Sequence, residues 1–262
     1  MPPGPAPRSA ADRLLDVLAA FDLRHPALSL TEISQRADLP LATAHRLVGT
    51  LTRWGALERD ESGGYHIGLR LWEVAALAPR GVALRQAALP FLEDLYEATH
   101  ENVHLAVRDG LEVVYIDRIS GRSAVGVLSQ VGARWPLHAT GVGLVLLAHG
   151  AAALQEQVCG GPLASFTPYT VTDPAALRRT LAEVRRAGCA VSDRQITEDA
   201  LSVAAPVRGP RGDVIAAVSV VVHVEDARTP ALIPAVRVAA RGVSRTLGWQ
   251  PGPGPVAALG PG

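Results

Sequence analysis

Residues 29–70 combine two short helical patterns, a tight turn between them and a hairpin pattern after them. Ser29 and Glu32 have the spacing of a capping box and predict where the first helix begins. Asp38 suits the turn, because its side chain tolerates the bent or left-handed backbone that a turn requires. Pro40 suits the first position of the second helix, where its missing N–H has no helical acceptor. This order of elements predicts a helix-turn-helix.

The second helix is predicted to have one buried face. Apolar side chains recur there at i, i+3, i+4 and i+7, at Ala44, Leu47, Val48 and Leu51. An opening helix repeats this spacing at Leu14, Val17, Leu18 and Phe21. Gly55 suits a C-cap, and strand-like segments on both sides of residues 60–64 predict a hairpin. Residues 10–70 therefore predict a winged helix-turn-helix domain, whose second helix is shaped to lie in the major groove of DNA.

The solvent side of that second helix carries the predicted DNA contacts. No acidic residue occurs between Asp38 and Glu58, so this side is free of carboxylates. Side chains at the start of the helix can meet base edges. Arg46 can either read guanine or hold a phosphate, and Arg36 and Arg53 suit phosphates. The predicted DNA-contacting residues are Arg36, Leu41, Ala42, Thr43, His45, Arg46, Arg53 and, in the hairpin, Tyr65.

The charge of the whole domain leaves a second interpretation open. Residues 1–72 hold eight arginines and eight acidic residues, and winged helices also serve as protein-interaction modules. Because so few positive charges give one subunit weak affinity for DNA, we expect self-association into a dimer or a tetramer. The whole chain has zero net charge, so DNA must be bound by a local patch.

The composition predicts a cytoplasmic protein of two domains. The chain has 262 residues, of which 48% are hydrophobic, enough for a small and a larger core. No apolar run is long enough for a membrane span, and the N-terminus lacks the apolar core of a signal peptide. Two cysteines are too few for a disulfide framework. The Pro/Gly-rich segments 1–9 and 249–262 are predicted to be disordered.

A mostly apolar segment, residues 68–79, predicts a helical connection that ends at Pro79. Residues 71–82 are assigned to this linker helix between the domains. A longer helix is predicted over about residues 82–100. Pro90 falls inside it and predicts either a kink or a later start.

Residues 83–248 predict a mixed domain. Two alternating strands flank Asp109-Gly110, a strong hairpin signal, and residues 122–132 have the pattern of a third strand. Three helices are predicted to follow, over residues 141–150, 151–158 and 174–187. Three strands come next, over residues 189–193, 201–208 and 213–223, and a last helix over residues 230–247. Hairpin-linked strands with helices between them predict an antiparallel sheet covered by helices, an α+β fold.

Residues 100–104, His-Glu-Asn-Val-His, match the zinc-protease motif H-E-x-x-H, which requires both histidines on one helical face. Here the helix is predicted to stop near His100, because the residues from Val103 alternate as in a strand. In a strand, His100 and His104 would lie about 13 Å apart, too far for one metal. A metal-dependent hydrolase that uses His100, Glu101 and His104 is therefore the weakest alternative, and no catalytic residue, metal or cofactor is predicted.

Six segments in the same order resemble the IclR family of bacterial transcriptional regulators, over residues 10–248. They are SLTEISQRADLPLATAHRLVGTL, GGYHIGLRL, HENVHLAVRDGLEVVYIDRI, VGARWPLHATGVGLVLLA, AGCAVSD and SVAAPVRGPRGDVIAAVSV. The resemblance implies a winged helix-turn-helix followed by a GAF-like effector-binding domain. It also implies that Glu101 and His104 are ordinary residues at these positions, which further weakens the metalloprotease interpretation.

The resemblance implies an effector site in the second domain for a small organic acid. A helix is predicted to begin near Thr140, Gly141 and Val142, where free amides and the helix dipole suit a carboxylate. In the family, an acidic residue, a cysteine and a Ser-x-Ser pair accompany this helix. They align here with Ser192 or Asp193, with Ser202, and with Ser219 and Val221.

This sequence departs from the family pattern at several of these positions. Leu144 replaces the usual lysine, and Gln195 replaces the usual glutamate. Val221 replaces the second serine of the pair, and Glu198-Asp199 stands where Pro-Gly is usual. Fewer polar anchors predict an aromatic or aliphatic acid as effector, and not a keto acid of two or three carbons.

The expected function is that of a ligand-responsive transcriptional regulator that binds double-stranded DNA, with repression favoured over activation. Effector binding would change the spacing of two winged helices through the linker helix. A rival of another class stays open, a DNA-binding protein whose second domain only dimerises. Thermal shifts with small acids would distinguish the two.

Overall fold

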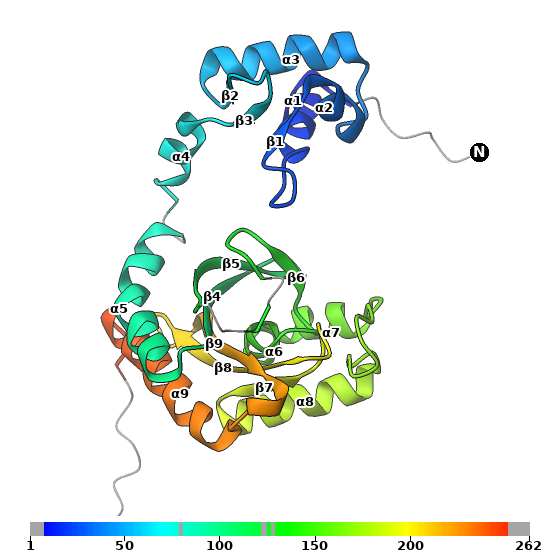
Figure 1. Cartoon of the computed structure of the whole chain (residues 1–262). Coiled ribbons are helices and arrows are strands. Elements are labelled where there is room, and N and C mark those ends of the chain that lie inside the picture. Colours follow the sequence, from blue (N-terminus) through cyan, green and yellow to red (C-terminus); the bar gives the residue numbers. More distant parts are fainter. Residues whose placement is uncertain (1–7, 79–80, 122–124, 127–128, 251–262) are drawn as a thin grey trace, which may run out of the picture. The chain divides into compact units, whose positions relative to one another are not determined.

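The computed structural model describes residues 8–78, 81–121, 125–126 and 129–250. The chain divides between Val82 and Ala83 into two compact units, whose elements are shown in Figure 1. No helix in the described ranges is long and apolar enough to cross a membrane.

The first unit consists of three helices and a small antiparallel sheet. The helices are α1 (Ala10–Ala19), α2 (Leu30–Arg36) and α3 (Leu41–Trp54). The strands are β1 (Ala27–Leu28), β2 (Leu57–Arg59) and β3 (Tyr65–Ile67), in the order β1-β3-β2. Val17, Ile33, Leu47 and Leu57 meet in its core. The predicted winged helix-turn-helix is confirmed, with β1 as a third strand that the sequence pattern did not predict.

Local sequence signals set the ends of these helices. Ser29 caps α2, and its hydroxyl accepts a hydrogen bond from the Glu32 amide in a capping box. Asp38 in the turn has a φ of 51°, and Gly55 after α3 has a φ of 87°, both left-handed. Pro40 is the N-cap and not the first helical residue, because its ψ of 140° is extended. The structure confirms the buried face of α3, which consists of Ala44, Leu47, Val48 and Leu51.

The start of the first unit differs from the prediction. Arg8 and Ser9, expected in a disordered tail, are part of the unit. Ser9 caps α1, and Arg8 forms ion pairs with Asp16 and Asp38. The C-terminal tail was predicted to begin at residue 249, but Trp249 is ordered against α9, because its amide donates to the Ser244 carbonyl. The rest of the two predicted tails, residues 1–7 and 251–262, lies outside the described residues.

The helix after the winged domain is shorter than predicted. α4 spans Leu69–Ala75 and has no buried residue, and turn residues follow at 76–77. The linker helix therefore does not extend over residues 71–82. Leu71 is the one α4 residue that packs, partly buried, against the core of the first unit, so the helix gains little of the packing energy on which short helices depend. The predicted end at Pro79 lies outside the described residues.

The second unit contains a six-stranded antiparallel sheet in the order β6-β5-β4-β9-β8-β7. The strands are β4 (Asn102–Asp109), β5 (Glu112–Ile119), β6 (Arg134–Pro136), β7 (Ala190–Asp193), β8 (Ala200–Arg208) and β9 (Val214–His223). The helices are α5 (Val82–Thr99), α6 (Gly141–Ala148), α7 (Ala152–Cys159), α8 (Pro174–Ala187), the short 3-10 helix η1 (Val224–Asp226) and α9 (Thr229–Thr246).

Each face of this sheet covers its own core. α5 and α9 pack on one face, where Leu92 and Val236 meet Leu105 of β4. α6 and α8 pack on the other face, where Leu144 and Leu177 are buried together, and Figure 1 shows these two helix layers. The predicted α+β fold with a helix-covered antiparallel sheet is confirmed.

The helix predicted over about residues 82–100 is confirmed, but one of the two alternatives for Pro90, a later start, is excluded, and a predicted strand is wrong. α5 does not start after Pro90 but runs through it from Val82. Pro90 is exposed, so the carbonyl that loses its helical donor can bind water. The described part of the predicted strand at 122–132 is irregular, because Gly132 has a φ of 85°, a turn conformation. Residues 122–124 and 127–128 lie outside the described residues.

Gly68 offers a test of packing in the first unit. A methyl group added to it would lie 2.3 Å from the Gly55 carbonyl oxygen. We expect Gly68→Ala to lower the free energy of unfolding by about 1–3 kcal/mol, because the backbone must shift. Gly49→Ala is the matched control, since nothing lies within 4 Å of its added methyl, and alanine inside a helix stabilises by about 0.5–1 kcal/mol. Hydrogen exchange of first-unit amides measures both; equal effects would contradict the close contact.

Candidate functional site

α3 presents a side free of carboxylates to solvent. The helix contains no acidic residue, and its exposed residues include Leu41, Ala42, His45, Arg46 and Arg53. Thr43, at the same end of the helix, is half-buried. Neither Arg46 nor Arg53 forms an ion pair with a described residue. Both guanidinium groups are therefore available to phosphates.

Two other residues predicted to contact DNA, Arg36 and Tyr65, interact with residues of the first unit itself. Arg36 donates from Nε to the Ala20 carbonyl at 2.6 Å and forms an ion pair with Asp22. Tyr65 packs half-buried against the core, and the Arg59 guanidinium lies 5.5 Å from its ring centre. Arg36 thus joins α2 to the segment after α1, which favours a structural role over phosphate binding.

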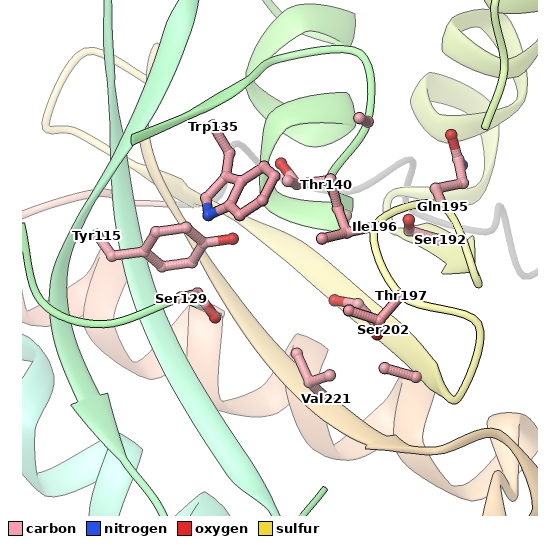
Figure 2. Close-up of a pocket in the computed structure, with 13 residues that line it drawn as sticks. Tyr115, Ser129, Trp135, Thr140, Ser192, Gln195, Ile196, Thr197, Ser202 and Val221 are labelled. Carbon is pink, nitrogen blue, oxygen red and sulfur yellow. The ribbon is translucent and has the colours of Figure 1, made fainter. Parts of the chain in front are cut away.

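A pocket lies beside the start of α6 in the second unit (Figure 2). It holds about 500 Å³ of space free of atoms, including a mouth open to solvent. Its apolar and aromatic walls are formed by Tyr115, Trp135, Ala139, Ile196, Ala200 and Val221. Its polar groups come from Ser129, Thr140, Gly141, Ser192, Gln195, Thr197 and Ser202. None of these thirteen residues carries a charge.

The start of α6 forms one polar end of the pocket. Thr140 caps the helix, and its hydroxyl accepts a hydrogen bond from the Gly143 amide at 3.0 Å. The amides of Gly141 and Val142 donate to no described residue. A methyl group on Gly141 would lie 2.7 Å from Oγ of Ser202, so its absence lets the first turn approach β8. These free donors and the helix dipole suit a carboxylate.

Tyr115 supplies a further polar group, and Figure 2 shows its hydroxyl pointing into the pocket, where it interacts with the hydroxyls of Thr140 and Ser129. Oγ of Ser129 lies 3.2 Å from Nε2 of His104, which contacts the Tyr115 ring edge-on at 5.2 Å. Burial, together with the charge of Arg118, lowers the pKa of His104 to about 3. Burial also raises the pKa of Tyr115, although the hydroxyls of Thr140 and Ser129 oppose this rise. Both rings are therefore neutral at physiological pH.

Five of the eight predicted effector residues line the pocket, namely Thr140, Gly141, Ser192, Ser202 and Val221. The other three do not. Val142 is buried in α6, and Ser219 is buried in β9 between Ala204 and His104 of the neighbouring strands. Asp193 forms an ion pair with Arg194 at 2.9 Å.

Several lining residues were not predicted. Tyr115 lies on the same side of β5 as the buried Val113, so strand alternation could have indicated its direction. Ser129 belongs to an irregular segment and Trp135 to a strand of three residues, where no periodicity is readable. Ile196 and Thr197 lie in the turn between β7 and β8.

As predicted, the helix stops near His100, and the two histidines of the H-E-x-x-H segment do not share a helix. α5 ends at Thr99, His100 has a φ of 56°, and His104 lies within β4. In the part of the chain that the structure describes, no three His, Cys, Asp or Glu side chains gather as metal ligands would.

Comparisons with known proteins agree with this arrangement. The family model for the IclR helix-turn-helix domain matches residues 10–61, and that for the bacterial transcriptional regulator IclR C-terminal domain matches residues 77–245. The transcriptional regulator XynR of Escherichia coli K12 is 33% identical over 245 residues, which cover 92% of this chain and 97% of the relative. The transcriptional repressor AllR of Klebsiella pneumoniae is 30% identical, covering 92% and 91% of the two chains.

A solved structure extends the similarity to three dimensions. It is an IclR homologue from Microbacterium hydrocarbonoxydans in complex with 4-hydroxybenzoate, 39% identical, with a TM-score of 0.87. The match covers 91% of this chain and 99% of that one. With matches over both units and almost the full length of its relatives, the chain belongs to the IclR family and is a ligand-responsive, DNA-binding transcriptional regulator.

Proposed function

We propose that this regulator is a repressor that releases its operator when an aromatic or aliphatic organic acid fills the pocket beside α6. The observation that carries the effector class is a pocket of aromatic, aliphatic and hydroxyl groups without a charged side chain. The repressor AllR supports repression as the mode of action. The 4-hydroxybenzoate complex of the Microbacterium homologue supports an aromatic acid as the ligand.

In the proposed complex, the effector carboxylate lies at the free amides of Gly141 and Val142. The hydroxyl of Ser202, close to Gly141, is a further donor to that carboxylate. The apolar body of the acid then packs against Trp135 and Val221. Burial of a ring on these side chains supplies affinity that two- or three-carbon acids lack.

In the proposed DNA complex, α3 lies in the major groove. The methyl groups of Ala42 and Thr43 contact thymine methyls, and Arg46 and Arg53 hold phosphates. Two copies of the chain bind together, because the few free arginines of one winged helix give low affinity. A dimer doubles these DNA contacts, and a dimer of dimers doubles them again.

The function proposed for the second unit is sensing and not catalysis. Its relatives are transcriptional regulators, and the pocket-lining residues include no His, Cys, Asp or Glu. The proposed localisation of the protein is the cytoplasm, where thiols stay reduced, and this suits the free, buried thiols of Cys159 and Cys189. The rival in which this unit only dimerises would bind no acid at all.

Arg46→Ala tests the DNA interface. We expect operator affinity to fall and the slope of log affinity against log salt to become shallower by about two per dimer, because two phosphate contacts are lost. Arg13→Ala is the control, since Arg13 lies on α1 and donates to the Arg8 carbonyl. Fluorescence anisotropy with operator DNA over a salt series measures both slopes. Unchanged affinity in the Arg46 variant would remove this residue from the interface.

Ligand selectivity tests the effector class. We expect benzoate and 4-hydroxybenzoate to bind at least about tenfold more tightly than pyruvate or glyoxylate, since a buried ring adds more than 1.4 kcal/mol of apolar contact. Calorimetric titration of the full chain measures these affinities. Equal binding of small keto acids would contradict the proposal, and no binding of any acid would favour the dimerisation rival.

Val221→Ser changes an apolar residue that lines this pocket and tests whether that residue contacts the ligand. The substitution adds a hydroxyl and removes an apolar contact, so the ratio of benzoate affinity to pyruvate affinity should fall several-fold. Val191→Ser is the matched control, because Val191 lies on β7 and does not line the pocket. A ratio that changes equally in both variants would exclude Val221 from ligand contact.

A further inference from the structure

A second cavity lies where α9 crosses the edge of β8. It holds about 690 Å³ free of atoms, including space open to solvent. β7 pairs with residues 201–204 of β8, so the last part of β8 has no strand beside it on that edge. Three arginines line the cavity there, Arg208 from β8 and Arg237 and Arg241 from α9.

These three charges have no counter-charge among the described residues of the chain. Arg237 and Arg241, one helical turn apart, form no hydrogen bond or ion pair with a described residue. Arg208 is fixed by a hydrogen bond to the Gly212 carbonyl at 2.8 Å, but likewise has no described carboxylate partner. Every Asp and Glu of the chain falls within the described ranges, and none of them lines the cavity.

The positive potential extends beyond the cavity. His149, at the end of α6, has a lowered pKa, mainly because it is buried. The charges of Arg208 and Arg185 lower that pKa further. Three guanidinium groups line one cavity, and because like charges repel one another, an anion that binds among them stabilises the arrangement.

We propose that the cavity binds a small polyvalent anion, a phosphate or pyrophosphate group, between Arg208, Arg237 and Arg241. Guanidinium groups present parallel N–H donors that match phosphate oxygens in bidentate geometry. The Trp249 side chain forms a further wall. The cavity shares no residue with the effector pocket, so the regulator can carry an anionic ligand together with an organic acid. The proposal does not depend on the identity of that acid.

Calorimetric titration of the DNA-free full chain tests this site, with sodium chloride holding ionic strength constant because screening alone changes such affinities. The probes are pyrophosphate, inorganic phosphate and glycerol 3-phosphate, which separate a free anion from a phosphate ester. We expect one site per chain. Arg237→Ala/Arg241→Ala should weaken it about a hundredfold, as each lost charged hydrogen-bond donor costs about tenfold.

Arg179→Ala/Arg186→Ala is the matched control, because it removes two exposed arginines from α8 that do not line the cavity. It should leave anion affinity unchanged. Arg237→Lys/Arg241→Lys keeps both charges but loses the fork, and should bind with intermediate affinity. If Arg237→Ala/Arg241→Ala fails to fold, the exposed Arg241→Gln takes its place, with an expected loss of about tenfold.

Three results would overturn the proposal. The first is no binding of any of the three anions at millimolar concentration. The second is equal loss of affinity in the α9 and α8 double variants, which would indicate nonspecific attraction. The third is unchanged affinity in the α9 variants, which would locate the anion elsewhere, for example on α3.

Discussion

The close contact between the start of α6 and β8 is the interaction on which the second unit depends. All eight residues of α6 are buried, so the helix must lie directly against the sheet. Gly141 allows this approach, because a methyl on it would lie 2.7 Å from Oγ of Ser202 on β8. Gly143 allows the segment before the helix to pack against the first turn, because a methyl there would lie 2.3 Å from the Leu137 carbonyl oxygen. The same approach leaves the first amides of the helix without partners beside Ser202. The contact between α6 and β8 therefore completes the core and also forms the polar end of the candidate effector pocket.

Much of the fold follows from local signals that the sequence displays. Ser29, Asp38 and Gly55 adopt the cap and turn conformations that their chemistry favours. The alternating pattern from Val103 indicates a strand, and His104 indeed lies in β4. The pocket was less predictable, because its walls come from strands, turns and irregular segments that meet only in three dimensions. Trp135 and Ser129 belong to segments without periodicity. Alignment with the family located Ser202 in the pocket, but it could not tell that Ser219 is sealed between two strands.

The first unit uses its arginines in two different ways, although the chain contains no lysine that could share these roles. In the first unit, Arg8 and Arg36 join helices through ion pairs and carbonyl contacts, while Arg46 on α3 is left without an ionic partner. A zero net charge therefore coexists with a basic surface, because pairing neutralises some arginines and not others. Charge counting over a domain misses this distinction, and only the geometry of the pairs reveals it.

The absence of charged side chains from the effector pocket has a consequence for how the regulator responds to its surroundings. Attraction between arginines and DNA phosphates weakens steeply as salt rises, because bound counterions are released. A carboxylate bound as proposed, by amides, hydroxyls and apolar walls, would be screened far less, since those partners are dipoles inside a partly enclosed space. Ionic strength therefore changes how much operator is occupied while leaving the effector concentration that the protein senses almost constant. In the proposed function, the DNA interface depends on charged side chains and the effector pocket does not, so the protein responds to ionic strength and to effector concentration separately.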